Sequence, residues 1–212
     1  MMWNQAVEGR NLRLRRFGAH DAAWLKASFA QEAFADAVNR PYAERIRALS
    51  EADVAAQLQA QALKSPLELG AHMLLIERLG GVRLGLACLV NLDAHNRRAE
   101  FIIGYPGEPP HGVVLLETGV LMAQVAFLRA KLHKVTATFY ADNPRVQAIT
   151  AIMAKVGFVA EGTQREHVRV SADRFVDVHL WAALATDVLS NPIVIKYAQR
   201  FLPPESQWAH RI

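Results

Sequence analysis

The stretch from Val113 to Leu132 constrains the fold of this chain more than any other part of the sequence. Its apolar residues recur with helical spacing on almost every face, which predicts a helix that is buried on most of its surface. Its longest apolar runs, Val113–Leu116 and Val120–Val125, are interrupted by Glu117 or followed closely by Arg129, so none approaches the ~18 uninterrupted residues of a membrane span. We therefore expect other layers of structure to cover this helix within the protein.

The first third of the chain has the pattern of one strand followed by helices. Asn11–Phe17 alternates apolar and basic residues, as in a strand with one wet face, and Asp21 is placed to cap the next helix. From Gln31 to Leu63 the composition favours helices, with Pro41 as a break. Ser50-Glu51-Ala52-Asp53 resembles a capping box at the start of a further helix.

Strand patterns begin after residue 70. The apolar runs Met73–Leu79 and Val82–Leu92 flank Gly80-Gly81, a pair that suits the positive backbone angles of a tight hairpin. Ala99–Tyr105 predicts a third strand. The loop 106–112, rich in proline and glycine, then leads into the buried helix.

The rest of the chain again alternates strands and helices. Val135–Tyr140 predicts a strand, and Asn143 is the natural N-cap of a helix that stops at Gly157. The remaining expected elements are a closing hairpin and a short helix in the tail: His167–Val170, Phe175–Ala182 and Asn191–Phe201. No internal repeat or flexible linker interrupts this order, so we expect one mixed α/β domain.

Charge and cysteine content narrow the class of protein. The formal net charge is +4, and the densest basic group, Arg10 to Arg16, alternates with leucines as on the exposed face of a strand, so no nucleic-acid partner is expected. The single cysteine, Cys88, lies in an apolar stretch, where it is most simply a core residue. The N-terminus lacks the apolar core of a secretory signal. We expect a cytoplasmic protein without a membrane association.

Four segments carry a resemblance to a known family. They are LRLRRFGAHDAAWL (Leu12–Leu25), NLDAHNRRAEFIIGY (Asn91–Tyr105), KVGFVAEGTQRE (Lys155–Glu166) and FVDVHLWAAL (Phe175–Leu184). In order and spacing they resemble the GNAT superfamily of N-acetyltransferases, and most closely its branch that acetylates the N-termini of ribosomal proteins.

The resemblance implies an α+β fold of the three-layer α/β type, with a GNAT-like mixed, mostly antiparallel central sheet and helices on both faces. It implies a single acyltransferase domain over residues 1–190, in which variable helices at 29–69 lie on the acceptor side. Residues 191–212 are expected to form a C-terminal tail with a short helix. Aromatic residues of the acceptor side would line an acceptor pocket or belong to the core: Trp24, Phe29, Phe34 and Tyr42.

The resemblance also implies an activity: transfer of an acetyl group from acetyl-CoA to a primary amine, by direct attack in a ternary complex. The acceptor would be a small-molecule or peptide amine, and a homodimer is a further expectation. Acetyl-CoA would be a co-substrate, and no metal is expected, because the histidines fall in separate elements without ligand spacing. The alternative is a catalytically degenerate acyl-CoA-binding or protein-interaction module on the same fold.

In this family a glycine-rich turn entering a helix cradles the pyrophosphate with backbone N–H groups. The matching loop here, Gly107–Leu115, departs from that pattern. Gly112 stands for the first glycine, Val114 occupies the place of the second, His111 lies where a basic residue is common, and Glu108 would oppose a phosphate. The amides expected to hold the phosphates are those of Gly112, Val113, Val114 and Leu115.

The pantetheine groove of this fold lies where the fourth and fifth strands separate. The resemblance places Phe139–Tyr140 and the end of the fourth strand beside the thioester, where backbone groups would pair with pantetheine and stabilise an oxyanion. The residues of the fourth strand concerned are Ile102, Ile103, Gly104 and Tyr105.

Four side chains are candidates for moving protons. Glu100, at the start of the fourth strand, could accept the proton of the substrate ammonium or be a solvated strand-end residue. His111 is a second candidate base. Tyr140 and Tyr105 could relay a proton to the thiolate or simply pack. Met153 occupies the position at which many family members carry a tyrosine acid, so no acid is expected there.

Asn143 lies before the helix whose start contacts the cofactor in many family members, which makes it a candidate cofactor-binding residue. The gap from Asn143 to Gly157-Phe158 is three residues longer than the family's usual spacing, close to one helical turn of ~3.6 residues. With the family's usual spacing, Val146 would instead occupy the position of the cofactor-contacting asparagine. A plain N-cap is the alternative role for Asn143.

Overall fold

A computed structural model describes residues 5–108, 110, 112–171, 173–204, 206 and 208. Its centre is an eight-stranded sheet in the order β1-β2-β3-β4-β5-β6-β8-β7. The strands are β1 (Val7–Glu8), β2 (Leu12–Arg16), β3 (Ala71–Arg78), β4 (Arg83–Asp93), β5 (Arg98–Gly104), β6 (Lys134–Tyr140), β7 (Val159–Ser171) and β8 (Arg174–Leu184). Within these residues β5 and β6 run parallel and the other neighbouring pairs are antiparallel.

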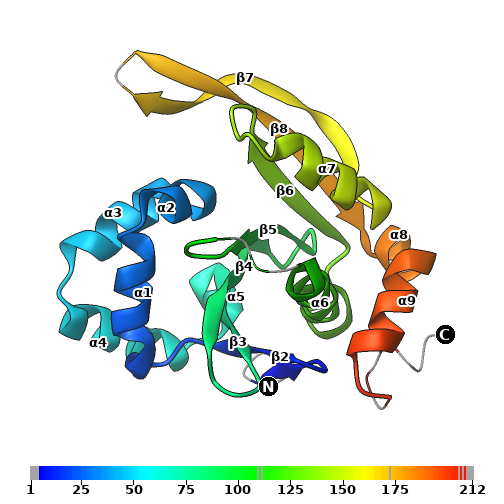
Figure 1. Ribbon diagram of the computed structural model, residues 1–212, viewed down its shortest axis with the longest axis horizontal. Coiled ribbons are helices and arrows are strands. Elements are labelled where there is room, and N and C mark those ends of the chain that lie inside the picture. Colours follow the sequence, from blue (N-terminus) through cyan, green and yellow to red (C-terminus); the bar gives the residue numbers. More distant parts are fainter. Residues whose placement is uncertain are drawn as a thin grey trace.

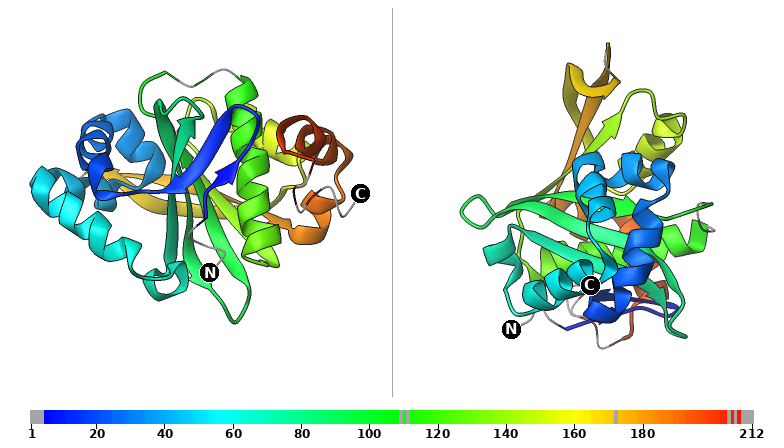
Figure 2. Two further views of the ribbon diagram at one scale, coloured as in Figure 1. Left: turned by 90° about the horizontal axis from the view of Figure 1, so that it is seen from below. Right: turned by 90° about the vertical axis from the view of Figure 1, so that its left-hand side faces the viewer.

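Helices cover both faces of the sheet (Figures 1 and 2). One side carries η2 (Ala19–Asp21), α1 (Ala22–Phe29), α2 (Glu32–Val38), α3 (Arg40–Ala48), α4 (Glu51–Ala62) and α5 (Pro66–Leu69). The other side carries α6 (Gly112–Ala123), the π-helix η3 (Gln124–Arg129), α7 (Val146–Lys155), α8 (Ala185–Leu189) and α9 (Pro192–Phe201). The buried residues form two apolar clusters, one for each face. The expected α+β architecture of three layers is confirmed.

The apolar helix predicted over Val113–Leu132 is present as α6 and its π-helical continuation. The amide of Ala130 reaches back five residues to the carbonyl of Val125, the wider spacing that defines a π-turn. By length and composition, Gly112–Arg129 is a helix long and apolar enough to cross a membrane, even though it contains Glu117 and Arg129. However, 61% of it is buried inside the protein, as for a core helix packed on a sheet.

The short C-terminal helix is confirmed as α9, and it belongs to the core instead of lying apart as a tail. The side chain of Asn191 caps it by accepting hydrogen bonds from the amides of Ile193 and Val194. Val194 and Phe201 are buried in the same apolar cluster as α6, so residues after 190 help to cover the central sheet.

Local signals placed several element ends correctly. Ser50 and Asp53 form the expected capping box of α4, and Gly81 has the positive φ (85°) of the expected hairpin turn. Two caps were wrong. Asp21 makes no capping hydrogen bond to α1, and α7 begins at Val146, with Arg145 at the N-cap position instead of Asn143.

The expected wet face of β2 was also wrong. Arg13 and Arg15 both bind the buried carboxylate of Glu77 on β3, and Arg15 also binds Asp21 at 2.7 Å. Asp21 is completely buried and accepts a further hydrogen bond from Arg83, at the start of β4. These arginines therefore tie the first helices to the sheet.

His72 on β3 should make stability depend on pH. The residue is only 4% exposed, and burial, reinforced by the charges of Arg16 and Arg129, lowers its pKa to about 4. Between pH ~6.5 and about 4, this histidine is protonated in the unfolded chain but stays neutral in the folded protein. The free energy of unfolding therefore falls as pH falls from 6.5 towards 4. From this group we expect a loss of about 2 kcal/mol at pH 4.5 relative to pH 7. Urea unfolding of wild type and His72→Gln at both pH values measures it, and equal losses in the two proteins would contradict the assignment.

Candidate active site

The site lies at a fork between two parallel strands in the middle of the sheet. β5 and β6 pair only through Arg98, Ala99 and Glu100, opposite Lys134, Val135 and Thr136. Beyond Glu100 the two strands diverge, while β5 stays paired with β4 as far as Gly104. The edge of β5 that faces β6 thus carries backbone N–H and C=O groups that β6 does not pair, and an extended ligand can bind them as a strand would.

Glu100 lies where the two strands part, and its carboxylate is held from both sides. The Thr138 hydroxyl on β6 donates to Oε1 at 2.6 Å, and the Asn91 side-chain amide on β4 donates to Oε2 at 3.1 Å. The residue is half-buried. These hydrogen bonds hold the half-buried carboxylate at the closed end of the fork.

The side chains after Glu100 alternate between the two faces of the sheet. Ile102 packs with the cluster under α1–α4, and Ile103 packs with the cluster under α6. Gly104 again faces the first helices, where a Cβ would overlap Val38 and lie 2.9 Å from a ring carbon of Phe34. The absence of a side chain at Gly104 lets α2 rest directly on the end of β5.

Replacing Gly104 by Val should therefore push α2 away from the sheet. Over-packing of this kind costs about 1–3 kcal/mol, so we expect a clear decrease in the free energy of unfolding. Gly119→Ala in α6 is the matched control, because a Cβ there meets nothing within 4 Å and removing a helical glycine is expected to be neutral or stabilising. Chemical denaturation measures both variants, and a Gly104→Val protein as stable as the control would contradict the close contact.

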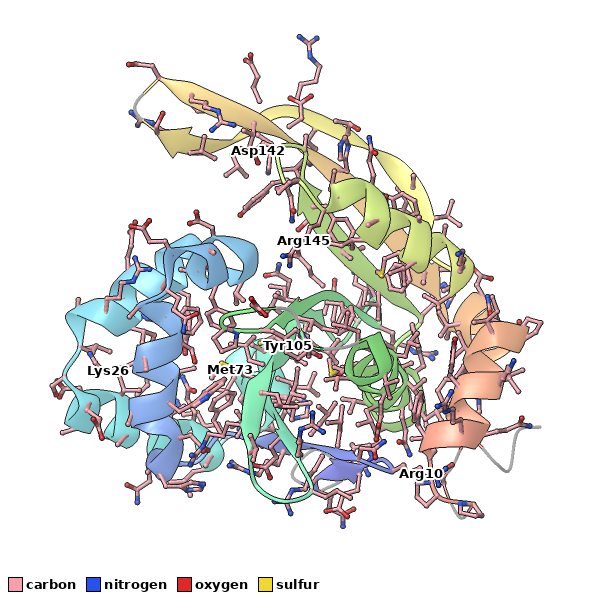
Figure 3. The ribbon with its side chains drawn as sticks, in the orientation of Figure 1. Arg10, Lys26, Met73, Tyr105, Asp142 and Arg145 are labelled. Carbon is pink, nitrogen blue, oxygen red and sulfur yellow. The ribbon has the colours of Figure 1, made fainter. Side chains whose placement is uncertain are left out.

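Tyr105 follows β5 and points away from the fork into the α6 side. Its hydroxyl donates to Thr118 Oγ1 at 2.8 Å, and burial raises its pKa to about 12. A buried hydroxyl with this partner and pKa anchors the end of β5 to α6. Of the two roles open to its side chain, packing is the one that the geometry supports. Figure 3 shows its position between the strands and α6.

The expected phosphate cradle is the start of α6. The helix begins at Gly112, so the amides of Gly112, Val113, Val114 and Leu115 occupy its first turn. Gly107 in the preceding loop has φ 77° and donates its amide to Gln31 Oε1 at 2.7 Å, which ties the loop to the N-terminal helices. Glu108 is exposed. His111 lies outside the described residues, so its predicted roles in catalysis and cofactor binding stay predictions.

The other predicted residues lie at the open end of the fork. Tyr140 is the last residue of β6 and is half-buried. The side-chain oxygen of Asn143 accepts a hydrogen bond from the amide of Arg145 at 2.9 Å, so Asn143 stabilises the turn before α7. This is an Asx turn two residues before the N-cap position, not the plain N-cap role expected as the alternative.

Sequence reasoning missed Arg145, Thr138 and Asn91. Arg145 is exposed at the start of α7, and in the view of Figure 3 its side chain extends from α7 on the side that faces β5. Its position directly after Asn143-Pro144, at the start of the helix, is the signal that could have drawn attention to it. Thr138 and Asn91 could not be identified, because their role depends on which strands neighbour Glu100.

Among the residues that the structure describes, no three His, Cys, Asp or Glu side chains come together as a metal site would require.

The fold is that of the GNAT acetyltransferases. A spermidine N-acetyltransferase from Vibrio cholerae, solved with CoA and spermine, superposes with a TM-score of 0.69 at 20% identity, over 84% of this chain and 98% of that one. RimL, a ribosomal L7/L12 alpha-N-protein acetyltransferase solved with coenzyme A, gives a TM-score of 0.69 at 16% identity, over 86% and 100%. No protein-family model matches the sequence, and no curated protein matches it at significant similarity.

Proposed function

We propose that this protein is an N-acetyltransferase that moves an acetyl group from acetyl-CoA to a primary amine. The observation that carries the proposal is the Glu100 carboxylate, fixed by Thr138 and Asn91 at the fork of two parallel strands. The structural neighbours, which include acetyltransferases of spermidine and of a ribosomal protein, support an amine acceptor that is either a small molecule or a peptide.

The chain offers groups for each part of acetyl-CoA. The first-turn amides of α6, at the positive end of an α-helix of 12 residues that continues into η3, suit the pyrophosphate. Arg145, exposed at the start of α7, supplies a further cation beside the one expected from His111 in the loop. The unpaired edge of β5 suits the amides of pantetheine.

The reaction follows from this placement. Glu100 accepts a proton from the substrate ammonium, directly or through water, and frees the nitrogen lone pair. The nitrogen attacks the thioester carbonyl carbon, a C–N bond forms, and an N–H of β5 faces the developing oxyanion. The C–S bond then breaks, the thiolate takes the second nitrogen proton, and the products are the acetamide and free coenzyme A.

Calorimetry with acetyl-CoA, followed by turnover with amines, tests the proposal. We expect saturable binding, and we expect Arg145→Ala to weaken it by about tenfold, as for the loss of one phosphate contact of ~1.4 kcal/mol. Arg200→Ala is the matched control, because Arg200 is an exposed arginine on α9 that lies over the Phe201 ring. Absence of heat with acetyl-CoA at about 1 mM would overturn the proposal, and binding without turnover of any amine would point to the non-catalytic module.

A further inference from the structure

A cavity of about 250 Å³ lies between the first helices and the sheet, on the same face as Glu100. Most of its wall is apolar: Phe17, Phe29, Val38, Tyr42, Met73 and Ile102 are representative. Exposed residues of its lining, such as Asn39, Arg45 and Ala62, place an opening to solvent beside α3 and the end of α4.

Among the residues that the structure describes, the cavity lining includes two arginines and no carboxylate. Its charged members are Arg16, whose guanidinium donates to the carbonyls of Gln61 and Lys64 at the end of α4, and Arg45, which lies 5.0 Å from the centre of the Tyr42 ring. Burial raises the pKa of both Cys88 and Tyr42 to about 12, so neither provides an anion near neutral pH. An ammonium group inside this cavity would meet two positive charges and no counter-ion.

The cavity ends next to the candidate base. Val90 and Ile102 both line it. Val90 on β4 is the register partner of Glu100, and Ile102 lies two residues along β5 on the same face as Glu100. A substrate whose apolar part fills the cavity can therefore place its amine at the Glu100 carboxylate, beside Val90 and Ile102 of the lining.

We propose that the acceptor is a monoamine carrying an apolar side group of roughly leucine to phenylalanine size, and that polyamines are poor substrates. This inference rests on the proposed acetyl transfer and specifies its acceptor. The volume supports the size, because an apolar cavity of ~150 Å³ already holds benzene in another protein. The charges support the exclusion, because the second and third ammonium groups of a polyamine would lie against Arg16 and Arg45.

An amine panel tests the acceptor class. With acetyl-CoA at saturation, kcat/KM is compared for phenylalaninamide, leucinamide, alaninamide and spermidine. Burying the larger side group should favour phenylalaninamide and leucinamide over alaninamide by about 10- to 100-fold. Spermidine should be the poorest of the four, and preference for spermidine over phenylalaninamide would overturn the inference while leaving the proposed function in place.

Two variants sharpen the test. Cys88→Phe fills the cavity and should remove the preference for phenylalaninamide over alaninamide. Arg45→Glu places an anion in the lining and should raise the ratio of spermidine to phenylalaninamide turnover by about tenfold, the worth of ~1.4 kcal/mol, whereas Arg200→Glu on α9 should not. An unchanged ratio in a folded Arg45→Glu protein would overturn the charge argument.

Acetyl-CoA binding without acetylation of any panel amine would overturn the acceptor class alone, and absence of acetyl-CoA binding would overturn the proposed function itself.

Discussion

Replacing Glu100 by Gln is expected to lower kcat/KM for amine acetylation by at least about 100-fold, the lower end of what a positioned general base contributes. The substitution keeps the shape of the side chain and an oxygen for the Thr138 hydroxyl, but it removes the group that takes the ammonium proton. Affinity for acetyl-CoA should stay within about twofold, because the residue is not expected to touch the phosphates or pantetheine.

Glu161→Gln is the matched control for that experiment. Glu161 lies on β7 and pairs with Lys134, next to the same strand β6 but outside the fork. An exposed pair of this kind contributes ~1 kcal/mol or less to stability, and we expect normal turnover in the control. A folded Glu100→Gln protein with wild-type turnover would remove Glu100 as the base.

The second large effect concerns stability. Asp21→Asn is expected to lower the free energy of unfolding by about 3–5 kcal/mol, because it breaks a buried ion-pair network on one side only. Asp21 is fully buried and accepts hydrogen bonds from Arg15, Arg83 and the amide of Gly18. With Asn at position 21, Arg83 loses its charged partner and Arg15 keeps only Glu77, while both guanidinium groups remain partly buried.

The pH dependence of this network has a definite sign. Burial alone would raise the pKa of Asp21, but the hydrogen bonds from Arg15, Gly18 and Arg83 outweigh burial and hold the pKa below its ordinary value. The stabilisation is therefore complete above the unfolded pKa of ~3.9 and is lost as pH falls below it. Denaturant unfolding at pH 7 checks the size of the effect, with Asp93→Asn, a half-buried partner of the exposed Arg98, as the control. Equal stability of the two variants would contradict the role of the network.

The sequence located part of the site. The motif that ends in AEFIIGY placed Glu100 and the residues up to Tyr105 on one strand beside the groove, and the apolar stretch after residue 112 placed a helix start next to it. Both are local patterns. The hydrogen bonds of Glu100 could not be predicted from the sequence, because Thr138 lies 38 residues away and becomes a neighbour only through the register of β6.

What the sequence by itself determined is the set of elements and their order, because hydrophobic periodicity and caps act over a few residues. The buried α6 helix is the clearest case: its composition alone requires covering layers. Tertiary structure decided what the charged and polar residues do. The alternation in β2 is the same whether Arg13 and Arg15 meet water or Glu77, and only the pairing of β2 with β3 brings that carboxylate beneath them. The same holds for the cavity beside Glu100, whose walls come from helices and strands far apart in the chain, so that packing between layers sets its size and charge.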